Sequence, residues 1–365
     1  MIVAGASLSL TGRYALQGRQ AMHGLRLWEI WVNEGGGLLV GSGEPPRPIS
    51  LQIYDDRSRI DEARTAVRRL LTEDRVDLLF GPYSSALTLA VAPVADAHGK
   101  ILWNHGGSSD EIHTQGWQYL IAGPAPASTY FASLPAWLRK VEPGIDGLLV
   151  LHAERGTFAR QVARGLTDAA EREGFRAVAS VPCDLSRVDL SVISDQESDD
   201  MPQALVLVGS HHDEIRWIQT REAFPANVRR IAAVSAGLTA FGEAVGALAE
   251  GIIGSSQWEP GMVEDVDVGP TGSWVLPRFR QAFGQEPEYP AMQALAMGLV
   301  AGECMRRAGS LRDEALREAA AGLDGTTCFG RFRIDEKTGQ QIAHRPVLVE
   351  WRGGEKKVVW GPSGP

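Results

Sequence analysis

The chain has 365 residues, of which 44% are apolar, and this length is sufficient for two domains with separate hydrophobic cores. Its 36 basic and 45 acidic residues give a net charge of −9 and are interspersed along the sequence. This pattern excludes the basic patch that a nucleic acid or an anionic membrane requires, and no apolar run is long enough to predict a transmembrane segment.

Short apolar runs alternate with stretches of helical spacing in the first half of the chain. This alternation is typical of a parallel sheet covered by helices. Strands are predicted at residues 2–7, 49–54, 78–80, 101–103 and 119–121. Helices are predicted at residues 18–33, 61–73 and 84–98.

The same pattern restarts near residue 147 and predicts a second lobe of the same α/β class. Its strands are predicted at residues 147–152, 177–181, 204–208 and 230–234, and its helices at 158–173 and 213–224. A long helix at 290–308, a shorter one at 311–321 and a strand-like run at 334–360 follow.

Segments rich in glycine and proline, at 123–126 and 259–261, are predicted to carry the chain between the lobes. The expected fold is therefore α/β, with two doubly wound, Rossmann-like lobes. Lobe 1 is expected at residues 1–122 plus 252–330, and lobe 2 at 123–251 plus 331–365.

The motifs of common catalytic sites are absent from the sequence. The first strand leads into GASLSLTG at residues 5–12, which does not fit the G-x-G-x-x-G pattern of a dinucleotide site. The phosphate-binding G-x-x-x-x-G-K-[ST], the nucleophile elbow G-x-S-x-G and the zinc motif H-E-x-x-H do not occur either. We therefore predict no enzymatic activity and no cofactor.

The run His211-His212-Asp213-Glu214 concentrates nitrogen and oxygen ligands, but adjacent residues at a strand-to-helix junction point in different directions. Asp213 is interpreted as the N-cap of the predicted helix, and no metal site is predicted. The three cysteines lack the C-x-x-C spacing of a metal or redox site. Cys304 and Cys328 either pair in an oxidising compartment or remain buried thiols.

Four segments combine into a recognisable pattern. They read LSLTGRYALQGRQAMHGLRLWEIWVNEGGG at residues 8–37, ISLQIYDDR at 49–57, FGPYSS at 80–85 and GGSSDEI at 106–112. Together they resemble the periplasmic binding proteins of the branched-chain amino-acid type, and weaker matches extend the resemblance over nearly the whole chain. The resemblance implies the type I fold, in which two lobes joined by a three-crossover hinge close on a ligand in the cleft between them.

The resemblance also implies a carboxylate-binding cradle made by Ser85, the backbone of Gly106 and the hydroxyl of Ser108. Physical chemistry supports this location, because the start of a helix after a parallel strand offers free N–H groups to an anion. Ser84 stands at the same helix start. The alternative interpretation is that these serines only cap helices.

Four further residues are predicted to line the ligand site beside the cradle: Tyr14, Gln17, Tyr83 and Trp103. For Trp103, packing in the protein core is an equal alternative, because its strand is predicted to be central in the sheet.

The sequence departs from the family in the second lobe. Members that bind amino acids hold the ligand's ammonium with an acidic residue where this chain has Ser-Ala-Gly at 235–237, and His211 replaces an aromatic residue. A buried ammonium without a countercharge is costly. Either Glu154 supplies the missing charge, or the ligand carries a carboxylate or an amide and no ammonium.

Three functions remain open at this point. The first is a periplasmic receptor that delivers a small molecule to the permease of an ABC transporter, with a signal peptide presumed removed. The second is a cytoplasmic sensor of the amide-regulator type, a group whose sequences are similar to Gly-Pro-Ala-Pro at 123–126. The third is an enzyme, for which no set of catalytic residues is evident.

Overall fold

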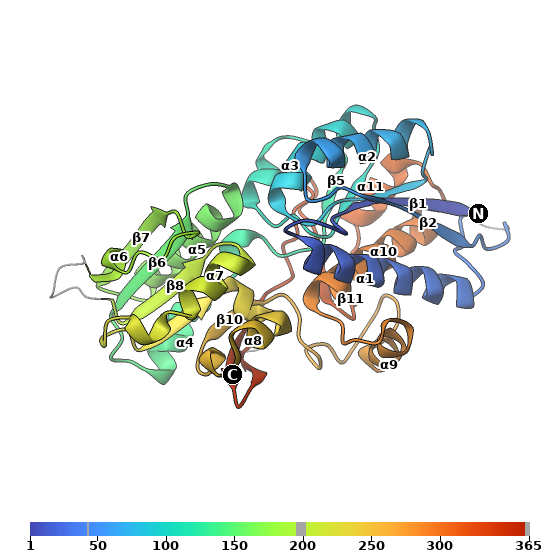
Figure 1. Cartoon of the computed structure of the whole chain (residues 1–365). Coiled ribbons are helices and arrows are strands. Elements are labelled where there is room, and N and C mark those ends of the chain that lie inside the picture. The colour runs from blue at the N-terminus through green and yellow to red at the C-terminus, as the bar shows by residue number, and fades with distance from the viewer. Residues whose placement is uncertain (42–43, 195–201, 362–365) are drawn as a thin grey trace. The chain divides into compact units, whose positions relative to one another are not determined.

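The computed structural model describes residues 1–41, 44–194 and 202–361 and consists of two compact α/β units (Figure 1). The first unit comprises residues 1–126 and 260–344, and the second comprises 127–259 and 345–365. The chain therefore passes between the units three times, after Pro126, Glu259 and His344.

A parallel sheet of five strands in the order β2-β1-β3-β4-β5 forms the centre of the first unit. Because β1 lies between β2 and β3, the strand order reverses beside it, as in other doubly wound sheets. The strands are β1 (Ile2–Leu8), β2 (Ile49–Asp55), β3 (Leu78–Phe80), β4 (Leu102–Asn104) and β5 (Leu120–Ala122).

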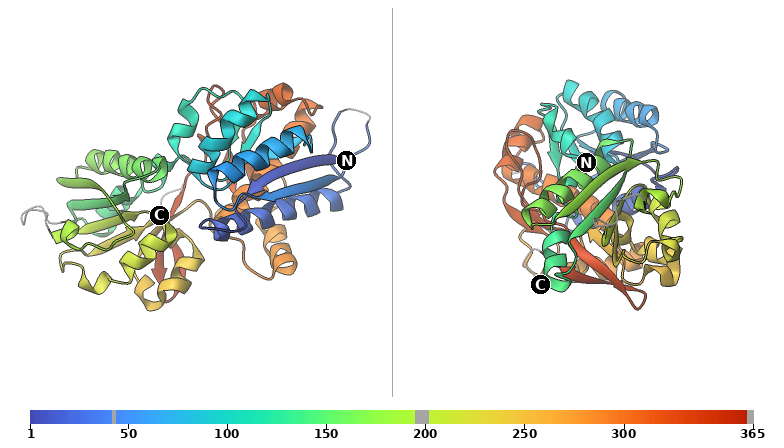
Figure 2. Two further views of the ribbon diagram at one scale, coloured as in Figure 1. Left: turned by 45° about the horizontal axis from the view of Figure 1, so that its top comes forward. Right: turned by 90° about the vertical axis from the view of Figure 1, so that its left-hand side faces the viewer.

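Helices cover both faces of this sheet, and Figure 2 shows them on either side of the strands. Leu79, Leu102 and Leu120 pack in one buried cluster with apolar residues of α2 and α3. On the other face, Phe80 meets Trp28 of α1 with ring centroids 5.4 Å apart. The helices are α1 (Ala15–Glu34), α2 (Ile60–Thr72), α3 (Ser85–Ala97), η1 (Asp110–Thr114), α9 (Gly272–Phe283), α10 (Tyr289–Ala308) and α11 (Asp313–Ala321), and the short hairpin is β11 (Gly325–Thr327) with β12 (Gly330–Phe332).

The second unit is built on a sheet of seven strands in the order β14-β13-β10-β9-β8-β6-β7. Strands β6 to β10 pair in parallel, whereas β13 runs antiparallel to β10 and to β14. The strands are β6 (Gly147–Ala153), β7 (Ala177–Cys183), β8 (Ala204–Val208), β9 (Arg230–Ala233), β10 (Ile253–Ser256), β13 (Val347–Arg352) and β14 (Glu355–Trp360).

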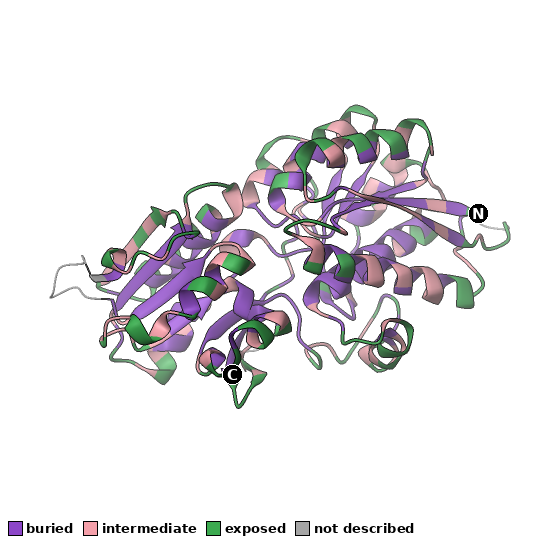
Figure 3. Cartoon of the chain, viewed as in Figure 1, coloured by how far each residue is buried: buried purple, intermediate pink, exposed green. Residues whose placement is uncertain are grey.

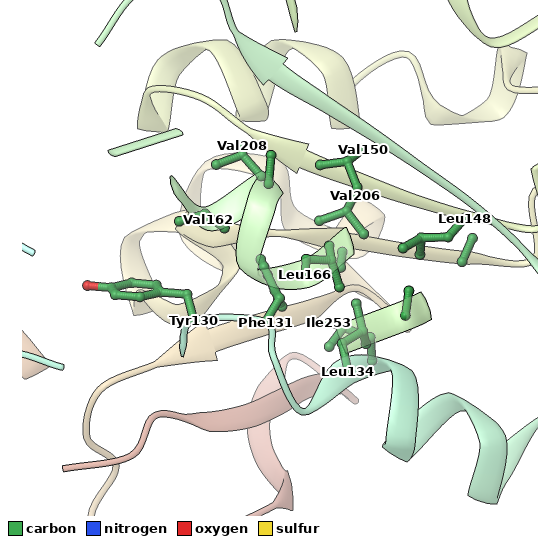
Figure 4. Close-up of a cluster of buried hydrophobic side chains, with 14 of the residues drawn as sticks. Tyr130, Phe131, Leu134, Leu148, Val150, Val162, Leu166, Val206, Val208 and Ile253 are labelled. Atoms are coloured by element: carbon green, nitrogen blue, oxygen red, sulfur yellow. The ribbon is translucent and has the colours of Figure 1, made fainter. Parts of the chain in front are cut away.

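Both faces of this second sheet are buried, which explains the continuous apolar runs of its central strands. Leu148 and Val150 belong to the cluster drawn in Figure 4, and Leu149 and Leu151 belong to a separate cluster. Figure 3 shows the same contrast between buried strands and exposed outer helix faces. The covering helices are η2 (Ala127–Thr129), α4 (Leu134–Val141), α5 (Thr157–Arg172), α6 (Ser191–Ser194), α7 (His211–Ile218), η3 (Arg221–Ala223), η4 (Val234–Gly237), α8 (Thr239–Val245) and η5 (Gly246–Ala249).

The α/β fold class predicted from the sequence is confirmed, but all three boundaries between the units differ from the expected ones. Residues 123–126, expected in lobe 2, belong to the first unit. Residues 252–259, expected in lobe 1, belong to the second unit because β10 pairs with β9 and β13. Residues 331–344, expected in lobe 2, belong to the first unit, where the Ala122 N–H donates to the Gly339 carbonyl at 2.9 Å.

The prediction that Asp213 caps a helix was wrong. Helix α7 begins at His211, and the Ser210 side chain caps it by accepting the Asp213 N–H at 3.3 Å. The Asp213 carboxylate in turn accepts the Ser210 hydroxyl at 2.6 Å. The predicted helix at 213–224 also ends earlier than expected, at Ile218.

The contact between α1 and α10 gives a test of the first unit's packing. A Cβ at Gly24 would lie 2.0 Å from the Ala291 carbonyl oxygen of α10. Gly24→Ala should therefore lower the free energy of unfolding by about 1–3 kcal/mol through overpacking. Gly272→Ala is the control, because a Cβ there meets nothing within 4 Å. Urea denaturation that gave both variants wild-type stability would contradict the contact.

Candidate functional site

The loops that follow β3 and β4 lie side by side at the carboxyl edge of the first unit's sheet. The Gly81 N–H donates to the Trp103 carbonyl at 3.1 Å, and Tyr83 forms a parallel bridge with Gly106. The Ser84 N–H then donates to the Gly106 carbonyl at 3.3 Å. Strand pairing thus continues beyond the strands themselves and brings the predicted cradle residues of both loops together.

Ser85 connects the two loops through its side chain. Its Oγ accepts the N–H groups of Ser108 and Ser109, at 3.3 and 3.0 Å respectively. Both bonds use the hydroxyl oxygen as an acceptor, so the hydroxyl hydrogen remains able to donate to a further group. Since Ser85 is only 7% exposed, this donor is held in a mostly desolvated position.

Gly106 is required by the close approach of the two loops. A Cβ at this position would lie 2.6 Å from the Tyr83 Cα, closer than real Cβ contacts. The Gly106 N–H donates to Asn104 Oδ1 at 3.1 Å. The predicted contribution of the Gly106 backbone to an anion cradle would therefore require this N–H to exchange its present partner.

Asn104 organises the second loop and was not singled out from the sequence. Its side chain is fully buried, donates from Nδ2 to the Gly107 carbonyl at 2.7 Å and accepts the Gly107 N–H at 2.8 Å. An asparagine followed two residues later by Gly-Gly is a turn signal that could have identified it.

Ser84 performs the capping role that the sequence left as an alternative. Its side chain accepts the Leu87 N–H of α3 at 3.3 Å, and its backbone φ is +103°. A non-glycine residue with positive φ is strained, and such residues often lie at functional sites.

The aromatic and amide residues predicted beside the cradle have different environments. The hydroxyls of Tyr83 and Tyr289 lie 2.9 Å apart, and the Tyr14 ring centroid is 6.3 Å from that of Tyr83. Gln17 is 8% exposed, and its Oε1 has no hydrogen-bond partner in the described part of the chain. Trp103 is 0% exposed and packs in the core of the unit.

His105 is a buried histidine that follows Asn104 at the end of β4. It is 0% exposed, and the backbone of Gly81 is the first group that opposes the effect of burial on the pKa of its ring. Burial lowers the pKa of His105 to about 4. The ring is therefore neutral at physiological pH.

The two second-unit residues predicted for the site differ in exposure. Glu154 is exposed at the end of β6, where its N–H donates to the Cys183 carbonyl at 3.3 Å. Burial, followed by the charge of Glu154, raises the pKa of the Cys183 thiol to about 11. His211 begins α7, its Nδ1 has no partner in the described ranges, and burial lowers its pKa.

Glu214 is a buried carboxylate that sequence reasoning did not select. Its two oxygens accept the N–H groups of Gly209 at 2.7 Å and Ser235 at 2.6 Å. Ser235 belongs to the segment 235–237, which has no acidic side chain. Its Oγ is buried, and the Ser235 side chain interacts with Glu214 and lowers the pKa of that carboxyl.

Metal ligands, disulfide bonds and membrane-spanning helices were sought among the described residues. No group of three or more His, Cys, Asp or Glu side chains in residues 1–41, 44–194 and 202–361 is arranged to hold a metal ion. Cys183, Cys304 and Cys328 form no disulfide bond with one another. No described helix combines the length and apolar character needed to cross a membrane.

Ser85→Ala should destabilise the first unit. The substitution removes the acceptor of two buried N–H groups, and an unsatisfied buried group costs about 1–3 kcal/mol. Urea denaturation should show a loss of this size, whereas Ser180→Ala, at an exposed position of β7, should leave stability unchanged. Equal stabilities of the two variants would show that the Ser85 hydrogen bonds do not form in solution.

The buried His105 predicts a pH dependence of stability. Its pKa rises from about 4 in the folded state toward the ordinary 6.5 on unfolding, so the unfolded chain binds the proton between these values. Stability should fall as pH decreases from 6.5 to 4, by at most about 1.4 kcal/mol per pH unit from this group. His105→Gln should remove that part of the slope in urea denaturation curves, and His98→Gln, at an exposed position, should retain it. A slope unchanged in His105→Gln would contradict the burial of a neutral ring.

Comparisons with known proteins agree over the whole chain. The family model described as periplasmic binding protein matches residues 2–356. Leu/Ile/Val-binding protein homolog 8 of Brucella abortus is 23% identical over 385 residues, which cover 98% of this chain and 89% of that protein.

Solved structures show the same fold. A leucine binding protein from Thermotoga maritima has a TM-score of 0.82 at 20% identity and is matched over 100% of this chain and 99% of its own. A solute binding protein of an ABC transporter from R. palustris, in complex with benzoate, has a TM-score of 0.79 at 17% identity, over 100% of this chain and 96% of its own.

Proposed function

Because this chain belongs to the periplasmic binding protein family, whose members are solute-binding receptors and not enzymes, we propose that it is the extracytoplasmic receptor of an ABC importer. Its ligand in this proposal is a small organic molecule that bears a carboxylate or an amide. Its compartment is the periplasm, reached with a signal peptide that is removed, and its partner is the permease of the transporter.

The arrangement of Ser85 is the observation that carries this proposal. Its hydroxyl oxygen is saturated by two backbone N–H groups, which leaves a buried O–H donor at the carboxyl edge of a doubly wound sheet. Ligands of such sheets bind beyond this edge. A donor in a desolvated position is best satisfied by an oxygen acceptor, such as that of a carboxylate or an amide.

The second unit supports a ligand without an ammonium group. The segment 235–237 has no acidic side chain, and both oxygens of the nearby Glu214 already accept backbone N–H groups. Glu154 is exposed, so water would weaken its attraction for a cation. An uncompensated buried ammonium would cost several kcal/mol, which favours an aromatic or branched carboxylic acid over an amino acid.

Among similar proteins, one name supports an amino-acid ligand and another supports an aromatic carboxylic acid. The Brucella relative is named for leucine, isoleucine and valine, and the R. palustris structure contains benzoate. The absence of an acidic residue at 235–237 is the feature of this chain that favours the second class.

Thermal unfolding with paired ligands tests the proposal. Each amino acid is matched by its des-amino acid and its amide, together with benzoate, after the protein has been unfolded and refolded to remove copurified molecules. A ligand at 100 times its Kd should stabilise the folded state by about 2.7 kcal/mol. We expect the des-amino acids or benzoate to raise the Tm and the α-amino acids to leave it unchanged.

The control for this experiment uses Ser85→Ala and Ser180→Ala. The first should reduce the ligand-induced rise in Tm relative to its own unliganded Tm, and the second should retain the full rise. A rise produced only by compounds with an α-ammonium would instead assign the chain to the amino-acid receptors. No rise with any compound would contradict the proposed ligand class altogether.

A further inference from the structure

The carboxylate of Glu214 joins two loops of the second unit at the carboxyl edge of its sheet. Gly209 lies in the loop between β8 and α7, and Ser235 lies in η4, directly after β9. Each donates its N–H to a different oxygen of Glu214, at 2.7 and 2.6 Å. The same side chain therefore sets the separation of two loops that are 26 residues apart in sequence.

Glu214 is buried without a cation. Its side chain is 0% exposed, and it forms no ion pair within the part of the chain that the structure describes. Burying an unpaired carboxylate is unfavourable, and the two short N–H donors compensate for it together with the Ser235 side chain. The two N–H groups donate to different oxygens of Glu214, so a neutral glutamine at this position would offer an acceptor at only one of the two oxygen sites.

Each of the joined loops also carries a polar atom that can still bind a ligand. His211 lies three residues before Glu214 on α7, a spacing that places both side chains on one face of the helix. Its Nδ1 is buried and has no partner among the described residues. The Ser235 side chain is only 6% exposed and interacts with Glu214, whose pKa it lowers, but a hydroxyl that donates keeps its acceptor lone pairs. An unsatisfied nitrogen and a hydroxyl with remaining acceptor capacity, on loops joined by one carboxylate, point to a group that is still to be bound.

We propose that Glu214 is a positioning residue of the ligand site, which holds the His211 and Ser235 loops at the spacing that lets both contact one ligand. This inference rests on the proposed receptor function and deepens it. Glu214 itself acts through the two loops and does not touch the ligand.

The ionisation of Glu214 provides a spectroscopic signature of this role. Burial raises the pKa of Glu214 to about 7, against the opposing effect of the N–H donors. Asp213 raises it further through its negative charge. Helix α7 packs against η4, which has no ionisable residue, and against α8. The ionisable side chains on α7 and α8 are His211, His212, Asp213, Glu214, Arg216 and Glu243.

Amide proton resonances of Gly209 and Ser235 measure the joined state directly. An N–H that donates to an ionised carboxylate is deshielded, so both resonances should move downfield as pH rises through about 7 in the wild-type protein. In Glu214→Gln, both should lose this titration and at least one should show faster hydrogen exchange. Glu243→Gln, at an exposed position of α8, should titrate like the wild type.

Calorimetric titration with benzoate then measures whether loss of the Glu214 hydrogen bonds weakens ligand binding. We expect Glu214→Gln to weaken benzoate binding at least tenfold at pH 8, and Glu243→Gln to change it less than twofold. Tenfold weaker binding in Glu214→Gln together with loss of the amide titrations supports the positioning role. Unchanged binding in a variant whose amide titrations are lost would overturn it.

The wild-type titration guards against a variant that fails to fold. If the two amide resonances do not move between pH 5 and 9 in the wild-type protein, Glu214 does not hold the loops and the inference fails without any variant. If the amide resonances move but benzoate does not bind to the wild-type protein, the proposed ligand class fails. The role of Glu214 in benzoate recognition is then rejected as well, whereas the hydrogen bonds that join the two loops are confirmed.

Discussion

Parallel strand pairing that continues past the ends of β3 and β4 is the constraint on which the candidate site depends. The bridge between Tyr83 and Gly106 brings two loops so close that a side chain on Gly106 would collide with the Tyr83 backbone. The polar side chains of Asn104 and Ser85 then satisfy the N–H groups that this approach buries. Backbone groups buried without partners would be costly, so the loop geometry and these two side chains are inseparable.

In the second unit, two adjacent loops are also joined by hydrogen bonds, but the acceptor is a carboxylate. The loops after β8 and β9 are joined by the carboxylate of Glu214, where the first unit uses a neutral amide and a hydroxyl. A carboxylate accepts two short N–H bonds at once but introduces a charge into an apolar environment. Burial of this charge raises the pKa of Glu214. The first unit's loops are therefore insensitive to pH near neutrality, whereas those of the second unit are tied to an ionisable group.

The sequence predicted the fold well because periodicity is a local signal. Runs such as ALVLV in β8 are buried on both faces, and their continuous apolar character indicates a central parallel strand. The boundaries between the units were harder to place, because the assignment of β10 depends on its antiparallel pairing with β13, almost 100 residues later. Asn104 and Glu214 were missed for the same reason. Their roles arise from contacts between loops, which the Asn-x-Gly-Gly turn signal at Asn104 indicates only in part and which a glutamate in a first helical turn does not indicate at all.

Ser84 and Ser85, which the sequence identified as candidate ligand-binding residues, also stabilise the fold. Ser84 caps α3, and Ser85 accepts two N–H groups, so both serines would be needed even without a ligand. Unsatisfied polar atoms do not by themselves mark a binding site, because the described residues leave buried atoms of Trp28, Thr88 and Gln293 without partners as well as those of Gln17 and His211. Within either unit, a ligand that supplied the partner of such an atom would recover the roughly 1–3 kcal/mol that an unsatisfied buried group costs.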